Sequence, residues 1–157
     1  MSRCRLLIPH EVQGQLREVF AGFTRELFEH LAPKFPPSKL LRYDGNAVGD
    51  LVKIRLGVGP VGATWISEIT EHELSEGEAF FVDEGRQLPP PLNYWRHKHL
   101  LTQVSPATVR ITEDITFGTP LGLLTSLMKP VIRAQFEARG PLYRSYFGGA
   151  VQDSRAA

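Results

Sequence analysis

Two histidines separated by one residue, His97 and His99, are the side chains of this sequence best suited to chemistry. They lie in a segment whose pattern predicts a β-strand, and alternate residues of a strand share a face. Trp95 therefore points the same way as both histidines, whereas Arg96 and Lys98 point the other way, into water. We expect the two imidazoles to face the interior, where either could act as a general base because imidazole titrates near neutral pH.

A carboxylate beside these histidines would orient them, and Asp83 could do so if it faces His97 across strands. Its position after an apolar strand and before Gly85 also fits a turn with a solvated carboxylate. The catalytic candidates are therefore His97, His99 and Asp83. A structural interpretation explains the same residues, because buried imidazoles must find hydrogen-bond partners, and Asp83, Glu84 or Glu113 on neighbouring strands would supply them. The sequence leaves both interpretations open.

The His-x-His pair also raises the question of a metal. Two histidines on one strand can hold zinc together with a carboxylate from Asp83, Glu84 or Glu113. A third histidine or a cysteine at a recognisable spacing is missing from the sequence, in which Cys4 stands alone near the N-terminus. We therefore expect no metal and no cofactor.

The N-terminal part of the chain predicts a short strand followed by helices. Residues 3–8 are expected to form a short first strand that Pro9 should end, because proline cannot donate a hydrogen bond to a sheet. From Val12 to Leu31 the apolar residues recur every three or four positions, which predicts one helix or two short helices joined at Gly22. The prolines at positions 33, 36 and 37 then predict a loop.

After this loop the apolar period changes to two, which predicts a series of β-strands. Short turns separate them, so neighbouring strands must pair antiparallel, because a parallel crossover needs a dozen or more residues. Trp65 should share the inner face of its strand with Ala63 and Ile69. The expected strands are residues 51–58, 61–71, 79–83, 92–103 and 109–117.

A long helix is expected near the C-terminus. Thr119 is a suitable N-cap and Pro120 a suitable first helical residue. Pro130 should kink or divide the helix, and Gly140-Pro141 should end its regular part. One apolar face of the helix would form a wall opposite the sheet, and it consists of Leu124, Leu127, Met128, Val131 and Phe136.

Three polar residues near these elements have less specific roles. Gln135 and Arg139 lie near the apolar helix face. Arg139 is expected at the surface, although its guanidinium could bind a carboxylate or phosphate head group. Asp114 is expected to pair across strands with Arg96 or Lys98.

Length and charge narrow the class of protein. The 157 residues suit one domain over residues 1–147, with a disordered tail at residues 148–157. A formal charge of +1 supplies no field for attracting nucleic acid. The longest apolar runs fall far short of the roughly 20 residues of a membrane-spanning helix, and no signal peptide core is apparent. With only one cysteine, these features favour the cytoplasm.

The order of strand, helices, antiparallel meander and long C-terminal helix resembles the START-like superfamily, the helix-grip domains that include pollen allergens, lipid-transfer domains and polyketide cyclases. Within it the sequence is similar to the bacterial ligand-binding SRPBCC proteins over about residues 28–139. The resemblance implies an α+β fold, in which a curved antiparallel sheet of six or seven strands wraps around the long C-terminal helix and two short helices follow the first strand. The motifs that carry it are Gly49-Asp50, Trp65 with Ile69 and Glu71, Phe81-Val82-Asp83-Glu84, Trp95-Arg96-His97-Lys98-His99, Asp114 and Pro120-Leu121-Gly122.

The resemblance also implies a cavity between sheet and helix that holds a small hydrophobic or amphipathic molecule, lipid-like or aromatic. Binding or carriage of such a molecule is our first hypothesis. The alternatives are an enzyme of the cyclase, dehydratase or hydrolase type and a module that binds another protein. A homodimer is one assembly that the sequence allows. The residues expected to contact the ligand are Trp65, Phe81, Trp95, His97, His99, Leu124, Met128, Val131 and Gln135.

Overall fold

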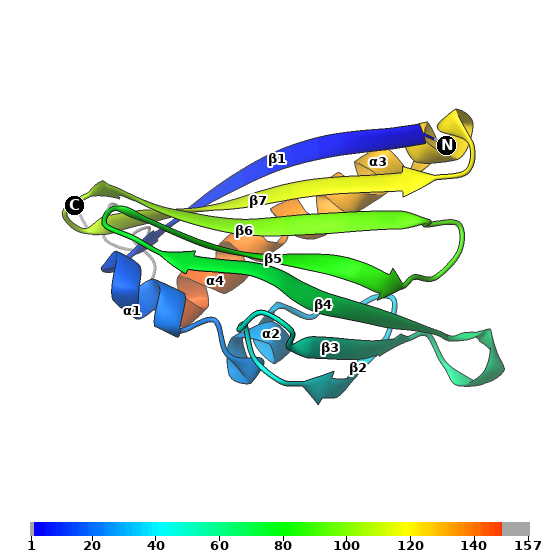
Figure 1. Ribbon diagram of the computed structural model, residues 1–157, viewed down its shortest axis with the longest axis horizontal. Coiled ribbons are helices and arrows are strands. Elements are labelled where there is room, and N and C mark those ends of the chain that lie inside the picture. The colour runs from blue at the N-terminus through cyan, green and yellow to red at the C-terminus, as the bar shows by residue number, and fades with distance from the viewer. Residues whose placement is uncertain (1, 149–157) are drawn as a thin grey trace.

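The computed structural model describes residues 2–148, in which seven strands form one antiparallel sheet (Figure 1). The strand order is β1-β7-β6-β5-β4-β3-β2, so β2 to β7 follow one another as neighbours and β1 adds beside β7. This is the meander that the short turns predict. The strands are β1 (Ser2–Gln13), β2 (Ser38–Tyr43), β3 (Leu51–Leu56), β4 (Ala63–Leu74), β5 (Glu78–Gln87), β6 (Tyr94–Ser105) and β7 (Thr108–Thr119).

Two short helices follow the first strand, as predicted: α1 (Leu16–Ala21) and α2 (Arg25–Leu31). Gly22 ends α1, and Thr24 caps α2 by accepting a hydrogen bond from the Leu27 amide. A 3-10 turn, η1 (Gly59–Val61), lies in the glycine-rich connection between β3 and β4. At the C-terminal end, α3 (Gly122–Glu137) and α4 (Arg139–Phe147) follow one another across one face of the sheet (Figure 1) and pack against β1.

The first strand is longer than predicted, because Pro9 does not end it. Pro9 pairs in register with Thr112 of β7. β1 is an edge strand with a single neighbour, and proline is tolerated there because its missing N–H is not needed by a second strand. The longer strand brings His10 and Val12 into the sheet with buried side chains.

The C-terminal helices also differ from the prediction in their boundaries. Leu121 is the N-cap of α3, whereas Thr119 belongs to β7 and its Oγ1 donates to the Leu121 carbonyl. Pro130 lies inside α3, and the division falls at Ala138 instead. Gly140-Pro141 does not end the helix, because it lies in the first turn of α4, where a missing N–H costs no intrahelical bond.

The buried apolar residues of the described chain form two clusters. The first cluster joins the sheet to α1, α2 and α4 and includes Phe23 and Tyr143. The second joins the sheet to α3 and includes Trp95 and Phe136. None of the described helices has the length and apolar character needed to cross a membrane. The tail predicted for residues 148–157 lies, apart from Gly148, outside the described residues.

Candidate functional site

A row of polar side chains crosses the inner face of the sheet between the two apolar clusters. On β7, for example, the fully buried Glu113 lies between Ile111 of the first cluster and Ile115 of the second. The same interruption occurs on β1 between Ile8 and Val12. We call this set the polar row, and it consists of His10 on β1, Glu113 on β7, His97 and His99 on β6, Asp83 on β5 and Ser67 on β4.

A cavity of about 330 Å³ lies between this part of the sheet and the helices. Its volume falls near the lower end of the range of ligand pockets, about 300 to 1,000 Å³. Most of its wall is apolar, and it reaches the surface beside α3, where the half-exposed Val131 lines it. Among the described residues, the polar side chains in its wall include Tyr43, Asn46, Ser67, Asp83, His97, His99, Gln135, Arg139 and Tyr143.

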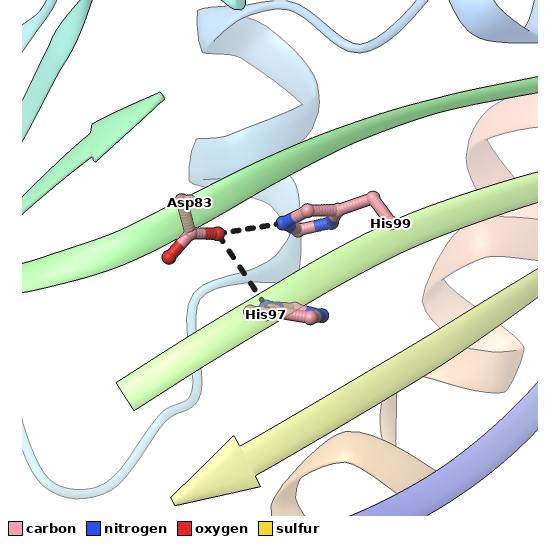
Figure 2. Close-up of side chains that lie close together, drawn as sticks. All are labelled: Asp83, His97 and His99. Carbon is pink, nitrogen blue, oxygen red and sulfur yellow. Dashed lines mark hydrogen bonds and ion pairs between the residues drawn. The ribbon is translucent and has the colours of Figure 1, made fainter. Parts of the chain in front are cut away.

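The two histidines of β6 each hydrogen bond to a different carboxylate. His97 Nε2 lies 2.8 Å from Glu113 Oε1, and His99 Nε2 lies 2.8 Å from Asp83 Oδ2. An ionised carboxylate only accepts, so each Nε2 carries the proton in these bonds. The Nδ1 atom of His97 lies 3.7 Å from the same Asp83 oxygen, beyond hydrogen-bond distance. Figure 2 marks both contacts of this oxygen with dashed lines. The two imidazoles lie against each other, with ring centroids 3.7 Å apart.

Glu113 connects the histidines to the C-terminal helices. Its Oε2 accepts from the Tyr143 hydroxyl at 3.0 Å and from Arg139 Nη1 at 3.3 Å. Burial opposes ionisation of Glu113, but the Arg139 guanidinium and the His97 ring outweigh it and hold the pKa of this carboxyl well below its usual range. His10 Nε2 lies 3.9 Å from the same oxygen, and burial lowers the pKa of His10. Glu113 is therefore a buried anion whose charge is balanced mainly by Arg139.

Asp83 and His99 form the second pair. Burial opposes ionisation of Asp83 too, but the hydrogen bond from His99, the electrostatic attraction of the two histidines and a hydrogen bond from Ser67 together outweigh it, and the pKa of the Asp83 carboxyl is lowered. Burial, helped by His97, lowers the pKa of His99 to about 4, so this ring is neutral at pH 7. His99 also stacks on Phe81 with ring centroids 4.2 Å apart. The pair thus sets an anion and a neutral imidazole into the cavity wall.

Comparison with known proteins identifies the fold. No protein-family model and no curated protein matches the sequence. Among solved structures, the ZhuI aromatase/cyclase from Streptomyces sp. R1128 matches with a TM-score of 0.70 at 12% identity, over 95% of this chain and 100% of that chain. Norcoclaurine synthase from Thalictrum flavum, in complex with dopamine and hydroxybenzaldehyde, matches with a TM-score of 0.67 at 10% identity, over 92% and 86% of the two chains.

A third match is the di-domain ARO/CYC StfQ from the steffimycin biosynthetic pathway, with a TM-score of 0.66 at 13% identity, over 98% of this chain and 52% of that chain. The chain has the helix-grip fold. Identities this low establish the fold and leave the activity open. The α+β fold class and the helix-grip arrangement predicted from the sequence are thereby confirmed.

Most of the residues expected to contact a ligand line the helix-grip cavity. Leu124 is the exception, because it is only half-buried and does not belong to the described lining. The helix presents Met128, Ile132 and Phe136 to the cavity instead, and Leu127 is 61% exposed. The expected residues in the lining are Trp65, Phe81, Trp95, His97, His99, Met128, Val131 and Gln135, together with Asp83.

Two polar residues have other partners than those expected. Arg139 does not lie at the surface. Its side chain extends toward the sheet and donates a hydrogen bond to the buried Glu113. Asp114 makes two hydrogen bonds of 2.8 Å with Arg5 of β1, in addition to its expected cross-strand position opposite Lys98 of β6. Both differences arise because the partner strand or helix lies far away in the sequence.

Three residues of the site were not singled out in the sequence. His10 and Tyr143 lie in the core beside Glu113, and Ser67 accepts a hydrogen bond of 2.9 Å from the Trp65 indole. The sequence does indicate the position of Ser67, because alternation along the strand places it on the same inner face as Trp65. For His10 the signal was hidden by Pro9, which suggested that the strand had already ended.

Proposed function

We propose that the chain binds a small, mainly apolar molecule, with one polar end, inside the helix-grip cavity. The observation that supports the proposal is a cavity of about 330 Å³ with an apolar wall and, in that wall, the Asp83, His97, His99 and Arg139 side chains. Burial of apolar ligand surface supplies the affinity, whereas these few polar groups fix the orientation of the ligand. Norcoclaurine synthase, which has the same fold and forms a complex with dopamine and hydroxybenzaldehyde, is a precedent for small aromatic ligands.

Filling the cavity should abolish this binding. Alternate residues of β3, including Ile54, line the cavity, so an Ile54→Trp variant places an indole in the space that a ligand needs. We expect affinity for 2-naphthol, a small aromatic alcohol, to fall at least tenfold, measured by isothermal titration calorimetry. Lys53→Trp is the matched control, because Lys53 is the next residue of the same strand on the opposite face.

The control should bind 2-naphthol like the natural chain. Circular dichroism of both variants checks that the larger side chain has not unfolded the protein, since overpacking can cost about 1 to 3 kcal/mol. Equal affinity in the folded Ile54→Trp variant and in Lys53→Trp would show that the probe binds elsewhere, and the proposal would fail.

A second candidate function is general-base catalysis in the same cavity. The observation that favours it is the placement of hydrogen-bonded histidines in the cavity wall. Because both Nε2 atoms donate to carboxylates, the basic lone pair of each neutral ring lies on Nδ1. His99 Nδ1 is enclosed, without a hydrogen-bond partner among the described residues. His97 is therefore the better of the two candidate bases.

Deuterium exchange into 2-tetralone, an aromatic ketone, tests this second candidate. A base removes a carbon-bound proton beside the carbonyl to give the enolate, and a deuteron from the solvent takes its place. We expect the protein to accelerate this exchange, as measured by proton NMR, and His97→Gln to lower the acceleration about 100-fold or more. His72→Gln is the control, because His72 lies on the exposed part of β4. An unchanged rate in His97→Gln would exclude His97 as the base.

A further inference from the structure

We propose that Asp83, His97 and His99 bind one divalent transition-metal ion of the zinc type. One ligand atom from each of these side chains lies within 4.8 Å of the other two. The three residues come from two adjacent strands, and Asp83 pairs with His97 in the register of β5 and β6. Figure 2 shows both histidines approaching the same oxygen of Asp83. The inference uses the same wall of the cavity as the proposed function, but it depends only on these side chains.

The spacing of the three ligand atoms suits a tetrahedral ion. Zinc bonds of about 2.0 to 2.2 Å to nitrogen and oxygen imply tetrahedral ligand separations of about 3.3 to 3.5 Å. The Asp83 Oδ2 atom lies 3.7 Å from His97 Nδ1 and 2.8 Å from His99 Nε2. These two distances bracket the ideal separation, and all three ligand atoms lie within 4.8 Å of one another.

Glu113 supplies the outer hydrogen bond that metal-bound histidines usually make. His97 donates from Nε2 to Glu113, which turns Nδ1 and its lone pair toward Asp83. A ligand histidine commonly donates its second ring N–H to a carboxylate, which fixes the tautomer and the ring orientation. Arg139 and Tyr143 hold Glu113 in place from the opposite side. The Glu113 carboxylate is therefore a fixed acceptor for the ring N–H of His97, on the side of the ring away from the proposed ion.

A bound ion would also change the tautomer of His99. His99 Nδ1 is buried and has no hydrogen-bond partner in the described part of the chain, and it lies 3.9 Å from Glu113 Oε1. If Nε2 binds a metal, the ring proton moves to Nδ1, where it faces Glu113. One change of tautomer thus gives the ion its third ligand and gives the orphan nitrogen a nearby acceptor.

The charges of the site also favour a cation. Arg139 balances Glu113, whereas the ion pairs that the described residues make with Asp83 involve only His97 and His99. A histidine, unlike an arginine, carries no permanent charge, so these pairs leave the Asp83 carboxylate without a permanent countercharge. Two imidazoles and one carboxylate suit zinc and its neighbours rather than magnesium or calcium, which prefer oxygen ligands. The fourth position would face the cavity and hold water or the polar end of a ligand.

Cobalt titration tests the site directly. The full chain is freed of metal with EDTA and titrated with Co²⁺, whose tetrahedral complexes absorb in the visible range. We expect one equivalent to bind, one equivalent of Zn²⁺ to displace it, and the affinity to fall at least tenfold in Asp83→Asn and in His99→Gln. Glu113→Gln should weaken binding by about 10- to 100-fold through the outer hydrogen bond. A His30→Gln/His72→Gln double variant, which removes two surface histidines, should bind Co²⁺ unchanged.

A measurement on the natural chain removes any dependence on how the variants fold. Long-range proton–nitrogen NMR should show His97 Nδ1 and His99 Nε2 shifting when Zn²⁺ is added, while the rings of His30 and His72 stay unchanged. Unmoved His97 and His99 resonances, or loss of cobalt binding in the surface double variant, would overturn the inference. Binding of 2-naphthol to the EDTA-treated chain separates the two proposals, because it requires the cavity and no metal.

Discussion

Replacing Glu113 by glutamine is expected to lower the free energy of unfolding by about 3 to 5 kcal/mol. Glu113 is fully buried and accepts hydrogen bonds from His97, Arg139 and Tyr143. Glutamine has nearly the same size, so packing is kept, but the Arg139 guanidinium loses its countercharge inside the core. Removing one partner of a buried ion pair costs this much because the remaining charge is left uncompensated. Urea unfolding followed by circular dichroism measures the loss.

Asp114→Asn is the matched control for this prediction. Asp114 is the next residue of β7 and also accepts from an arginine, but the Arg5 side chain is 62% exposed. An exposed pair contributes about 1 kcal/mol or less, so the control should change stability little. A Glu113→Gln/Arg139→Met double variant should recover part of the lost free energy of unfolding, because it also removes the uncompensated charge of the Arg139 guanidinium. Similar losses in Glu113→Gln and Asp114→Asn would contradict the account.

The alternation of residues along the strands was sufficient to predict the sheet and much of the site. In β6 the basic residues Arg96 and Lys98 flank His97, and this pattern placed both histidines on the inner face, where the structure has them buried. The same reasoning placed Trp65 and Ile69 inward. Such predictions succeed because the period of two is a local property of a strand and does not depend on what the strand packs against.

Features set by distant parts of the chain were not predictable. Pro9 was expected to end its strand, because the sequence does not reveal that β1 is an edge strand with one neighbour. Arg139 was expected at the surface, and only the bend between α3 and α4 turns it and Tyr143 toward Glu113. Leu124 was placed on the cavity wall by its helical spacing, but the cavity does not extend along the whole of α3.

The second large prediction concerns pH. The free energy of unfolding of the metal-free protein should fall by about 3 kcal/mol between pH 7 and pH 4. The pKa of His99 is lowered to about 4 by burial, with help from His97, whereas an unfolded histidine has a pKa of about 6.5. Between about pH 6.5 and pH 4, the unfolded state therefore binds a proton at His99 that the folded state does not bind. Stability decreases wherever acidification lets the unfolded state bind more protons.

Other titratable groups near His99 also contribute to the change of stability with pH. Asp83 and Glu113 face the ring, and because their own pKa values are lowered, their contribution to stability is lost below about pH 5, in the most acidic part of this interval and beyond it. His10 acts in the same direction as His99, because burial lowers its pKa too. Urea unfolding at half-unit steps of pH, with EDTA present, measures the slope.

In His99→Gln the slope between pH 6.5 and pH 4 should be shallower, because a glutamine amide can still donate to Asp83 but does not titrate. His30→Gln should leave the slope unchanged, since His30 is exposed and lies on α2, away from the polar row. A stability that stays constant from pH 7 to pH 4 would mean that His99 takes up its proton without unfolding. The ring would then be charged between Asp83 and Glu113 at acidic pH, and burial would not lower the pKa of His99 in the folded protein.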